Sequence, residues 1–169
     1  IERNSNGYFY KATVKVFVFL ILYLLLTFSL VPFIAGYFGR VPLPVKQTDF
    51  LKPRNVITWL LNRNYVTSEL RNISLSVAKE MNEKYPGTVT YYLDANFPFF
   101  NHFPLFPHLS HNDGRKLDLS FFYLDAKTKA PTNNAPSWMG YGVSIASLDN
   151  EKNQCKICES KGYWQYGLL

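Results

Sequence analysis

Residues 16–38 read VFVFLILYLLLTFSLVPFIAGYF, a run of 23 residues without a charge. At about 1.5 Å of rise per residue, a helix of this length exceeds the roughly 20 residues that cross the hydrocarbon core of a bilayer. A secretory signal peptide would have a shorter apolar core and a small-x-small cleavage site, and the sequence GYFGRVPLP offers no such site. A buried core helix would carry a polar face, which this run lacks. The run therefore predicts an uncleaved anchor and a single-pass membrane protein.

Basic residues flank the anchor, three before it and two after it: Arg3, Lys11, Lys15, Arg40 and Lys46. Because positive charge favours the cytoplasmic side, this slight excess predicts that residues 1–15 are cytoplasmic. The rest of the chain then faces the periplasm or the exterior. Three prolines in RVPLPVKQTDFLKPRN indicate an extended linker over residues 39–55, and residues 56–169 form the predicted domain.

The pattern after the linker predicts an α+β domain, with an antiparallel sheet and a packed amphipathic helix. The helix is expected over 68–85, capped by Ser68 and closed by Pro86 and Gly87. Its apolar stripe consists of Leu70, Ile73, Val77, Ala78 and Met81. Residues 88–94, TVTYYLD, and 117–125, LDLSFFYLD, are predicted strands because they are rich in β-branched and aromatic residues.

Composition limits the classes of partner. Aromatic residues make up 17% of the chain and charged residues 18%, which favours a packed domain over a disordered chain. The net charge of +6 is spread along the chain rather than gathered into a basic stripe with stacking aromatics, so no nucleic-acid partner is expected. Cys155 and Cys158 form a single CxxC in a polar stretch, which favours a local disulfide or two free thiols. A redox protein using this pair is a minor alternative.

A candidate metal motif, SHNDGRKLD, occupies residues 110–118 and places His111 and Asp118 seven positions apart. Zinc in hydrolytic sites takes three protein ligands from His, Asp, Glu or Cys. Gly114 can adopt positive φ, so the loop can double back and bring the two side chains together. The alternatives for Asp118 are an ion pair with Arg115 or Lys116 and a plain surface position.

The segment before this motif, NFPFFNHFPLFPHLS, places three prolines among five phenylalanines. Proline denies it a regular ladder or helix, so it is predicted to be an ordered loop packed by aromatic rings. His102 and His108 lie in this loop as further candidate ligands. His108 and His111 are three positions apart, a spacing expected to pair them only in a helical turn, which Pro107 disfavours.

SHNDGRKLDLSFFY resembles the first zinc motif of the metallopeptidases that include lysostaphin-type endopeptidases, D-Ala-D-Ala carboxypeptidases and hedgehog domains. The likeness is strongest to penicillin-insensitive murein endopeptidases and extends over about residues 88–125. The resemblance implies a Zn²⁺ cofactor held by His111 and Asp118, with Gly114 as the turn residue and Ser110 as a loop support. The family's third ligand and its catalytic base belong to a later motif that contains histidine. No histidine follows His111, so we expect those residues beyond Leu169.

The combined expectation is a membrane-anchored zinc peptidase that hydrolyses an amide bond in peptidoglycan cross-links or stem peptides. Its catalytic residues are not identified, and the domain over 56–169 is expected to be incomplete. The alternative is a non-catalytic binding module of the cell envelope. In that module His111 and Asp118 would be structural or remnants of a metal site, and the loop of prolines and phenylalanines would grip a partner.

Overall fold

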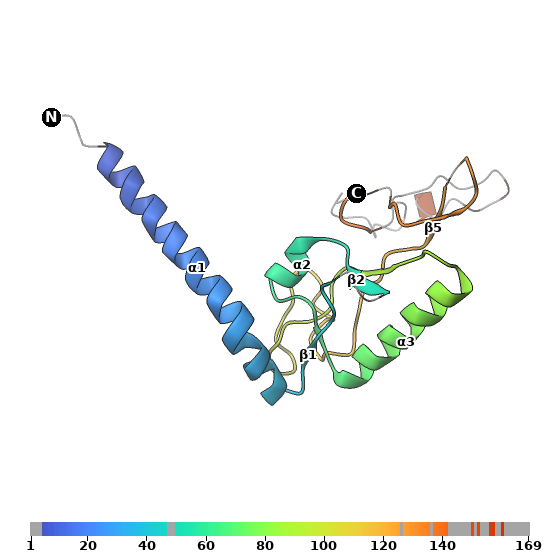
Figure 1. Cartoon of the computed structure of the whole chain (residues 1–169), viewed down its shortest axis with the longest axis horizontal. Coiled ribbons are helices and arrows are strands. Elements are labelled where there is room, and N and C mark those ends of the chain that lie inside the picture. The colour runs from blue at the N-terminus through green and yellow to red at the C-terminus, as the bar shows by residue number, and fades with distance from the viewer. Residues whose placement is uncertain are drawn as a thin grey trace.

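The structure is a computed structural model. It describes residues 5–46, 50–125, 127–135 and 137–141, together with positions 150, 152, 156, 157 and 160. The predicted cysteine pair, Cys155 and Cys158, lies outside the described residues. Figure 1 shows a long N-terminal helix beside a domain of short strands and shorter helices.

The N-terminal helix α1 covers Ser5–Tyr37 and contains the predicted anchor. Its large apolar side chains are exposed almost throughout, as expected for a helix that faces lipid. Residues Gly7–Tyr37 are the one stretch, among the residues described, that is long and apolar enough to cross a membrane. The chain therefore has one candidate membrane span near its N-terminus, and the predicted orientation stays a prediction.

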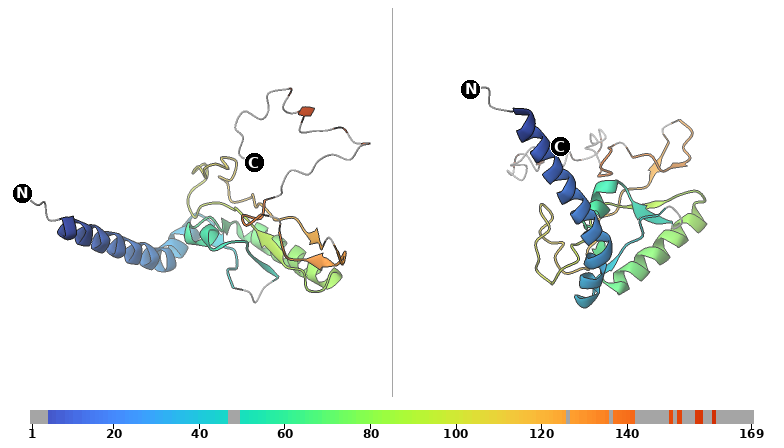
Figure 2. Two further views of the ribbon diagram at one scale, coloured as in Figure 1. Left: turned by 90° about the horizontal axis from the view of Figure 1, so that it is seen from above. Right: turned by 60° about the vertical axis from the view of Figure 1, so that its left-hand side comes forward.

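The domain packs beside the C-terminal half of α1, and the views in Figures 1 and 2 agree that α2 is its nearest helix. Helix α2 is short, Val56–Leu60, and begins where the Asn55 side chain accepts a hydrogen bond from the Thr58 amide. The Tyr23 hydroxyl of α1 donates to the Leu60 carbonyl at 2.6 Å. The rings of Phe28 and Trp59 pack with their centroids 5.6 Å apart. Because α1 is held by these contacts, the anchor and the domain have a defined relative position.

The strands form three two-stranded sheets within the described residues, rather than one antiparallel sheet. Strands β1, Val41–Pro42, and β3, Tyr65–Val66, are antiparallel, as are β5, Tyr123–Leu124, and β6, Pro131–Thr132. Strands β2, Leu51–Pro53, and β4, Thr90–Tyr92, are parallel. The α+β class is confirmed, whereas a single antiparallel sheet is not seen. Proline in β1, β2 and β6 shortens the ladders because it has no amide hydrogen to donate.

Residues of the predicted linker are part of the packed domain. They are extended, as expected, but they supply both β1 and β2. Leu43 and Leu51 are buried in the core with Val66, Ala78 and Tyr92. The Tyr92 hydroxyl also donates to the Pro44 carbonyl at 2.9 Å. This stretch therefore ties the domain directly to the end of α1.

Helix α3, Ser68–Lys84, matches the predicted helix at 68–85 but differs at its cap and its buried face. Thr67 caps it by accepting from the Leu70 amide, and Ser68 is the first helical residue. The buried face centres on Ser74 and Ala78. Ile73 and Val77, predicted as part of the apolar stripe, are exposed. The stripe is confirmed at Ala78 and Leu70, which belong to or pack against the core. It is wrong at Ile73 and Val77, because apolar spacing cannot recognise the buried Ser74, whose hydroxyl donates to the Leu70 carbonyl.

Candidate metal centre

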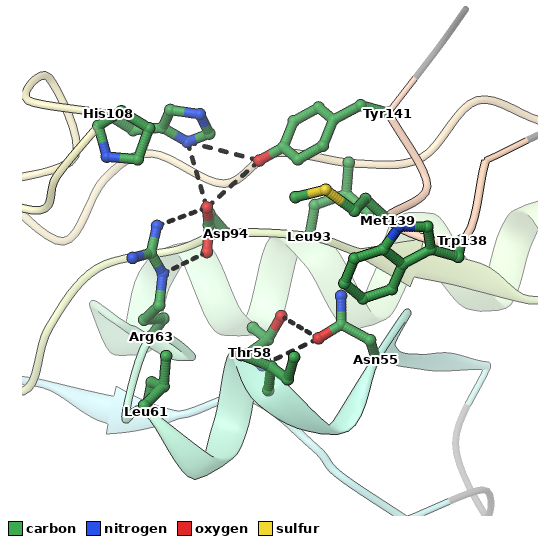
Figure 3. Close-up of a pocket in the computed structure, with 12 residues that line it drawn as sticks. Asn55, Thr58, Leu61, Arg63, Leu93, Asp94, His108, Trp138, Met139 and Tyr141 are labelled. Carbon is green, nitrogen blue, oxygen red and sulfur yellow. Dashed lines mark hydrogen bonds and ion pairs between the residues drawn. The ribbon is translucent and has the colours of Figure 1, made fainter. Parts of the chain in front are cut away.

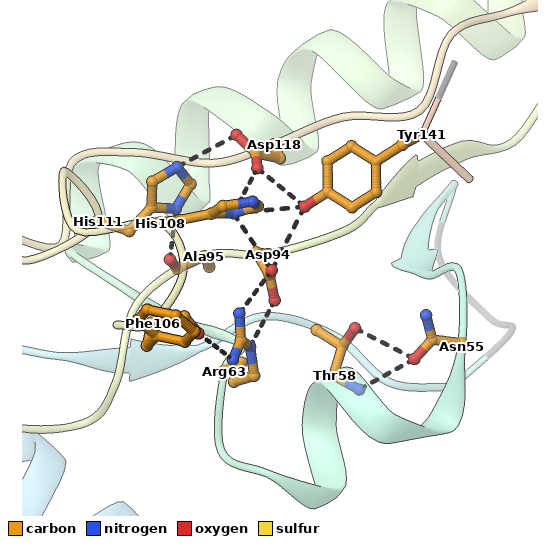
Figure 4. Close-up of polar contacts among 10 residues, drawn as sticks. All are labelled: Asn55, Thr58, Arg63, Asp94, Ala95, Phe106, His108, His111, Asp118 and Tyr141. Atoms are coloured by element: carbon orange, nitrogen blue, oxygen red, sulfur yellow. Dashed lines mark hydrogen bonds and ion pairs between the residues drawn. The ribbon is translucent and has the colours of Figure 1, made fainter. Parts of the chain in front are cut away.

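Three chain segments meet beside the C-terminal end of β4 (Figure 4). There, ligand atoms of His108, His111 and Asp118 all lie within 4.8 Å of one another. His111 is buried, and the other two side chains are partly exposed. The group could therefore hold a metal ion with three protein ligands and leave a side open. We call these three residues the metal cluster.

Asp118 is placed by a short backbone ladder with the end of β4. The Leu93 amide donates to the Asp118 carbonyl and the Asp118 amide to the Asp94 carbonyl, each at 2.8 Å. The predicted strand at 117–125 thus pairs at its beginning, although its regular part is only β5. Since side chains alternate along extended backbone, Asp118 and the buried Ser120 share the inner face. Lys116, which the sequence offered as an ion-pair partner of Asp118, pairs instead with Asp113, with a nitrogen–oxygen distance of 3.0 Å.

His111 presents one ring nitrogen to a backbone carbonyl and the other to Asp118. Its Nδ1 lies 2.6 Å from the Ala95 carbonyl oxygen, and its Nε2 lies 3.1 Å from Asp118 Oδ1. A carbonyl can only accept, so Nδ1 carries the hydrogen. Nε2 of the neutral ring and the carboxylate oxygen are then both hydrogen-bond acceptors. Two acceptors at this distance are unfavourable unless a cation lies between them. That cation is either a proton on Nε2 or a metal ion, and a carbonyl bonded to the far nitrogen is the usual support of a metal-binding histidine.

His108 joins the cluster through a turn that is not helical. The His111 amide donates to the His108 carbonyl at 2.9 Å, and the two ring centroids are 5.4 Å apart. His108 Nδ1 lies 3.1 Å from Asp118 Oδ2. The expectation that this pair requires a helical turn is wrong, because one hydrogen-bonded turn brings residues three apart together. His102 is exposed and is not in the cluster.

Gly114 makes the turn predicted from the sequence, with φ of +77°. Its amide donates to Asn96 Oδ1 at 3.1 Å, and its carbonyl accepts from the Thr67 amide at 2.9 Å. The guanidinium of Arg40, which is buried, lies where a Cβ at this position would project. Close approach and positive φ both require glycine here.

Three further side chains surround the metal cluster: Asp94, Arg63 and Tyr141. The sequence did not identify them as candidate site residues. Arg63 makes a bidentate pair with Asp94, with two nitrogen–oxygen distances of 2.7 Å. Asp94 Oδ2 lies 3.3 Å from His108 Nδ1. The Tyr141 hydroxyl lies 3.0 Å from Asp118 Oδ2 and 3.3 Å from Asp94 Oδ2.

These neighbours set the charge of the site. Burial, reinforced by the charges of Asp94 and Asp118, raises the pKa of the Tyr141 phenol far above its usual value. Tyr141 is therefore a neutral donor at physiological pH. With neutral histidines, the two carboxylates outnumber the one guanidinium, Arg63. The arrangement has an excess of acceptors and of negative charge, which a bound cation would offset.

A pocket of about 250 Å³ adjoins this arrangement (Figure 3). The polar wall of the pocket consists of Asp94, His108 and Tyr141. Its apolar side includes Trp138 and Met139. The pocket thus reaches one ligand of the cluster, so a small molecule in it would contact the site. This combination of an apolar pocket with a few convergent polar groups is typical of a binding or catalytic site.

Asp94 carried a faint signal in the sequence, because it is the only charged residue of the predicted strand TVTYYLD. Arg63 and Tyr141 carried none, since they come from segments with no recognisable motif.

No protein-family model, no curated protein and no solved structure matches the chain.

Proposed function

We propose that the chain is a membrane-anchored, zinc-dependent hydrolase that cleaves an amide bond in the peptides of the cell wall. The observation that carries the proposal is the pairing of His111. Its Nδ1 is committed to the Ala95 carbonyl, and its Nε2 faces a carboxylate. In this proposal His108 is the third ligand, in place of a histidine further along the chain.

The donor set suits zinc. Two imidazoles and one carboxylate are ligand types that zinc accepts, and three protein ligands leave a position for water or substrate. Zinc so held supplies Lewis acidity, which polarises a carbonyl and lowers the pKa of a bound water to about 7. In amide hydrolysis the hydroxyl of water joins the carbonyl carbon, and its proton goes to the leaving nitrogen.

The surrounding residues have separate roles in this proposal. Tyr141 remains protonated, so its hydroxyl can donate a hydrogen bond to a substrate carbonyl that gains negative charge. Arg63 holds Asp94 through two hydrogen bonds and so fixes the carboxylate that contacts His108. The cell wall as substrate is supported by the candidate membrane span and by the resemblance of SHNDGRKLDLSFFY to murein peptidases.

Metal content tests the ligand set directly. The full chain, purified in detergent and dialysed against zinc, should hold one zinc ion per chain by elemental analysis. His108→Asn and His111→Asn should each lose that ion, and His102→Asn is the matched control because His102 lies outside the cluster. Circular dichroism checks that each variant is folded. Zinc retained by a folded His111→Asn variant would refute the site.

Activity is tested on isolated peptidoglycan and its soluble peptide fragments. The products are separated by chromatography and identified by mass spectrometry. We expect new amine termini, loss of cleavage with a zinc chelator and recovery when zinc is restored. A zinc-loaded chain that leaves every amide bond of these substrates intact would overturn the peptidase function and leave a metal-binding module.

A further inference from the structure

The pocket beside the metal cluster shares a wall with the contact between the domain and α1. That wall is α2 and the residue after it, because Ile57 and Leu61 both line the pocket. The same short helix is bonded to α1, since its Leu60 carbonyl accepts from the Tyr23 hydroxyl at 2.6 Å. The position of α1 in a membrane therefore fixes the position of one side of the pocket.

The contact between Tyr23 and Leu60 lies within the bilayer when the uncharged part of α1 spans it. A span of about 20 residues that begins at the first uncharged position, Val16, ends near Ala35. A span that begins four residues earlier, with the Lys15 ammonium reaching back to the headgroups, still extends past Tyr23. Tyr23 lies roughly 21 Å before the end of α1, at about 1.5 Å per residue. Helix α2 thus lies beside a membrane-embedded part of α1.

The C-terminal carbonyls of α2 are suited to an environment without water. A helix ends with four carbonyls that lack partners within it, and in lipid each needs a donor from the protein. All four carbonyls of residues 57–60 have one. The donors are the amides of Leu61, Arg63 and Asn62, at 2.8–3.0 Å, and the Tyr23 hydroxyl. The Asn62 side chain is itself bonded to Thr27 Oγ1 of α1, at 3.3 Å.

The rim of the pocket is apolar and exposed. Ile57 is 49% exposed, Leu61 48%, Met139 47% and Trp138 69%. In water these side chains would be an unfavourable lining for the mouth of a polar site, whereas against acyl chains they cost nothing. The domain makes a further aromatic contact just after α1, where the exposed ring of Phe100 packs edge-on against Phe38, with centroids 6.0 Å apart.

We propose that α2 lies among the acyl chains and that the pocket opens onto the bilayer, so that the metal cluster acts on a peptide still attached to a membrane lipid. The apolar end of such a substrate stays in the membrane, past Ile57 and Leu61. Its peptide reaches the polar wall of Asp94, His108 and Tyr141. The position of α2 is independent of metal, whereas the substrate class rests on the proposed zinc-dependent amide hydrolysis.

The position of α2 is tested by quenching with labelled lipid. Cys155 and Cys158 are replaced by serine, and Ile57→Cys is labelled with an environment-sensitive fluorophore in vesicles that contain doxyl-labelled phosphatidylcholine. Ile73→Cys is the matched control, because Ile73 is 53% exposed on α3, and no hydrogen bond or ring contact among the described residues joins α3 to α1. We expect quenching at Ile57 about threefold stronger than at Ile73. Leu61→Cys provides a second site if the Ile57 variant does not fold, and equal quenching at all positions overturns the proposal.

The substrate class is tested in the same vesicles with two amide substrates of one peptide sequence, one joined to a lipid and one soluble. We expect the zinc-loaded chain to cleave the lipid-linked peptide at least tenfold faster, a difference of about 1.4 kcal/mol. Equal rates would overturn the lipid-linked substrate and leave the proposed hydrolase intact. Cleavage of neither peptide, with strong quenching at Ile57, would overturn the hydrolase and with it the substrate class, while α2 keeps its place in the lipid.

Discussion

Arg63 partly balances the negative charge of the acidic side chains at the metal cluster. It pairs with Asp94, and both side chains are nearly buried, with 16% and 14% exposed. We expect Arg63→Gln to lower the free energy of unfolding of the zinc-free protein by about 2 kcal/mol, because it leaves the Asp94 carboxylate unpaired. Zinc should restore part of this loss, so the rise in melting temperature on adding zinc should be larger in the variant.

Thermal unfolding in detergent, with chelator and with zinc, measures both effects. Arg115→Gln is the control, since it removes the same charge from an exposed position near the site. A zinc-free Arg63→Gln protein as stable as the Arg115→Gln protein would contradict the balancing role.

Gly114 carries a second prediction at the residue scale. A methyl group there would overlap the Arg40 guanidinium, and φ is +77°. Gly114→Ala must displace the Arg40 guanidinium, which bonds the Asp113 carbonyl and, at 2.7 Å, Asn101 Oδ1. We expect a loss of about 3 kcal/mol in unfolding free energy, from both strain and lost hydrogen bonds.

Gly87→Ala separates these two causes. Gly87 has a φ of +88° and nothing within 4 Å of the added Cβ, so its substitution should cost only about 1 kcal/mol of backbone strain. Both values come from denaturant unfolding of the full chain in detergent. Equal losses in the two variants would show that Arg40 moves aside freely.

At the scale of elements, the sequence predicts helices better than strands. Helices α1 and α3 have strong local signals, an uncharged run and an amphipathic repeat. The strands are only two or three residues long, and β2 pairs with β4 across a crossover that contains α2 and α3. No local pattern specifies such a partner, because pairing depends on segments distant in the sequence.

The candidate site shows the same limit. His111, Asp118 and the turn at Gly114 were predictable, since they lie within nine residues of one another. His108 was a weaker prediction, because a spacing of three residues was expected to bring it to His111 only in a helical turn. Asp94 reaches the cluster through strand pairing, which the sequence does not reveal.

The N-cap of α3 gives a prediction at this scale. The Thr67 side chain accepts from the Leu70 amide at 3.3 Å, whereas the sequence favoured Ser68 as the cap. We expect Thr67→Ala to reduce the unfolding free energy by about 1 kcal/mol, since the helix loses its capping acceptor. Ser68→Ala, at an exposed helical position, should change it by less than about 0.5 kcal/mol. A larger loss of unfolding free energy for Ser68→Ala than for Thr67→Ala, measured by denaturant unfolding, would show that Ser68 is the cap.

For the whole molecule, the question is what fixes the domain against α1. The Tyr23 hydroxyl bonds the Leu60 carbonyl, and Thr27 accepts from Asn62. Away from water these hydrogen bonds have no competing partner, so removing both hydroxyls should loosen the domain. We expect Tyr23→Phe combined with Thr27→Val to broaden the distance distribution between spin labels at positions 15 and 80, measured by pulsed electron resonance in vesicles.

Thr13→Val is the matched control, because the Thr13 hydroxyl bonds the Phe9 carbonyl within α1, at 2.9 Å, and is exposed. Its distribution should stay as narrow as that of the parent chain. A double variant that also stays narrow would assign the attachment to apolar contacts such as the packing of Phe28 on Trp59. A broadened distribution instead makes the polar contacts the feature that holds the pocket at a fixed depth, because the same helix, α2, forms both the contact and the pocket wall.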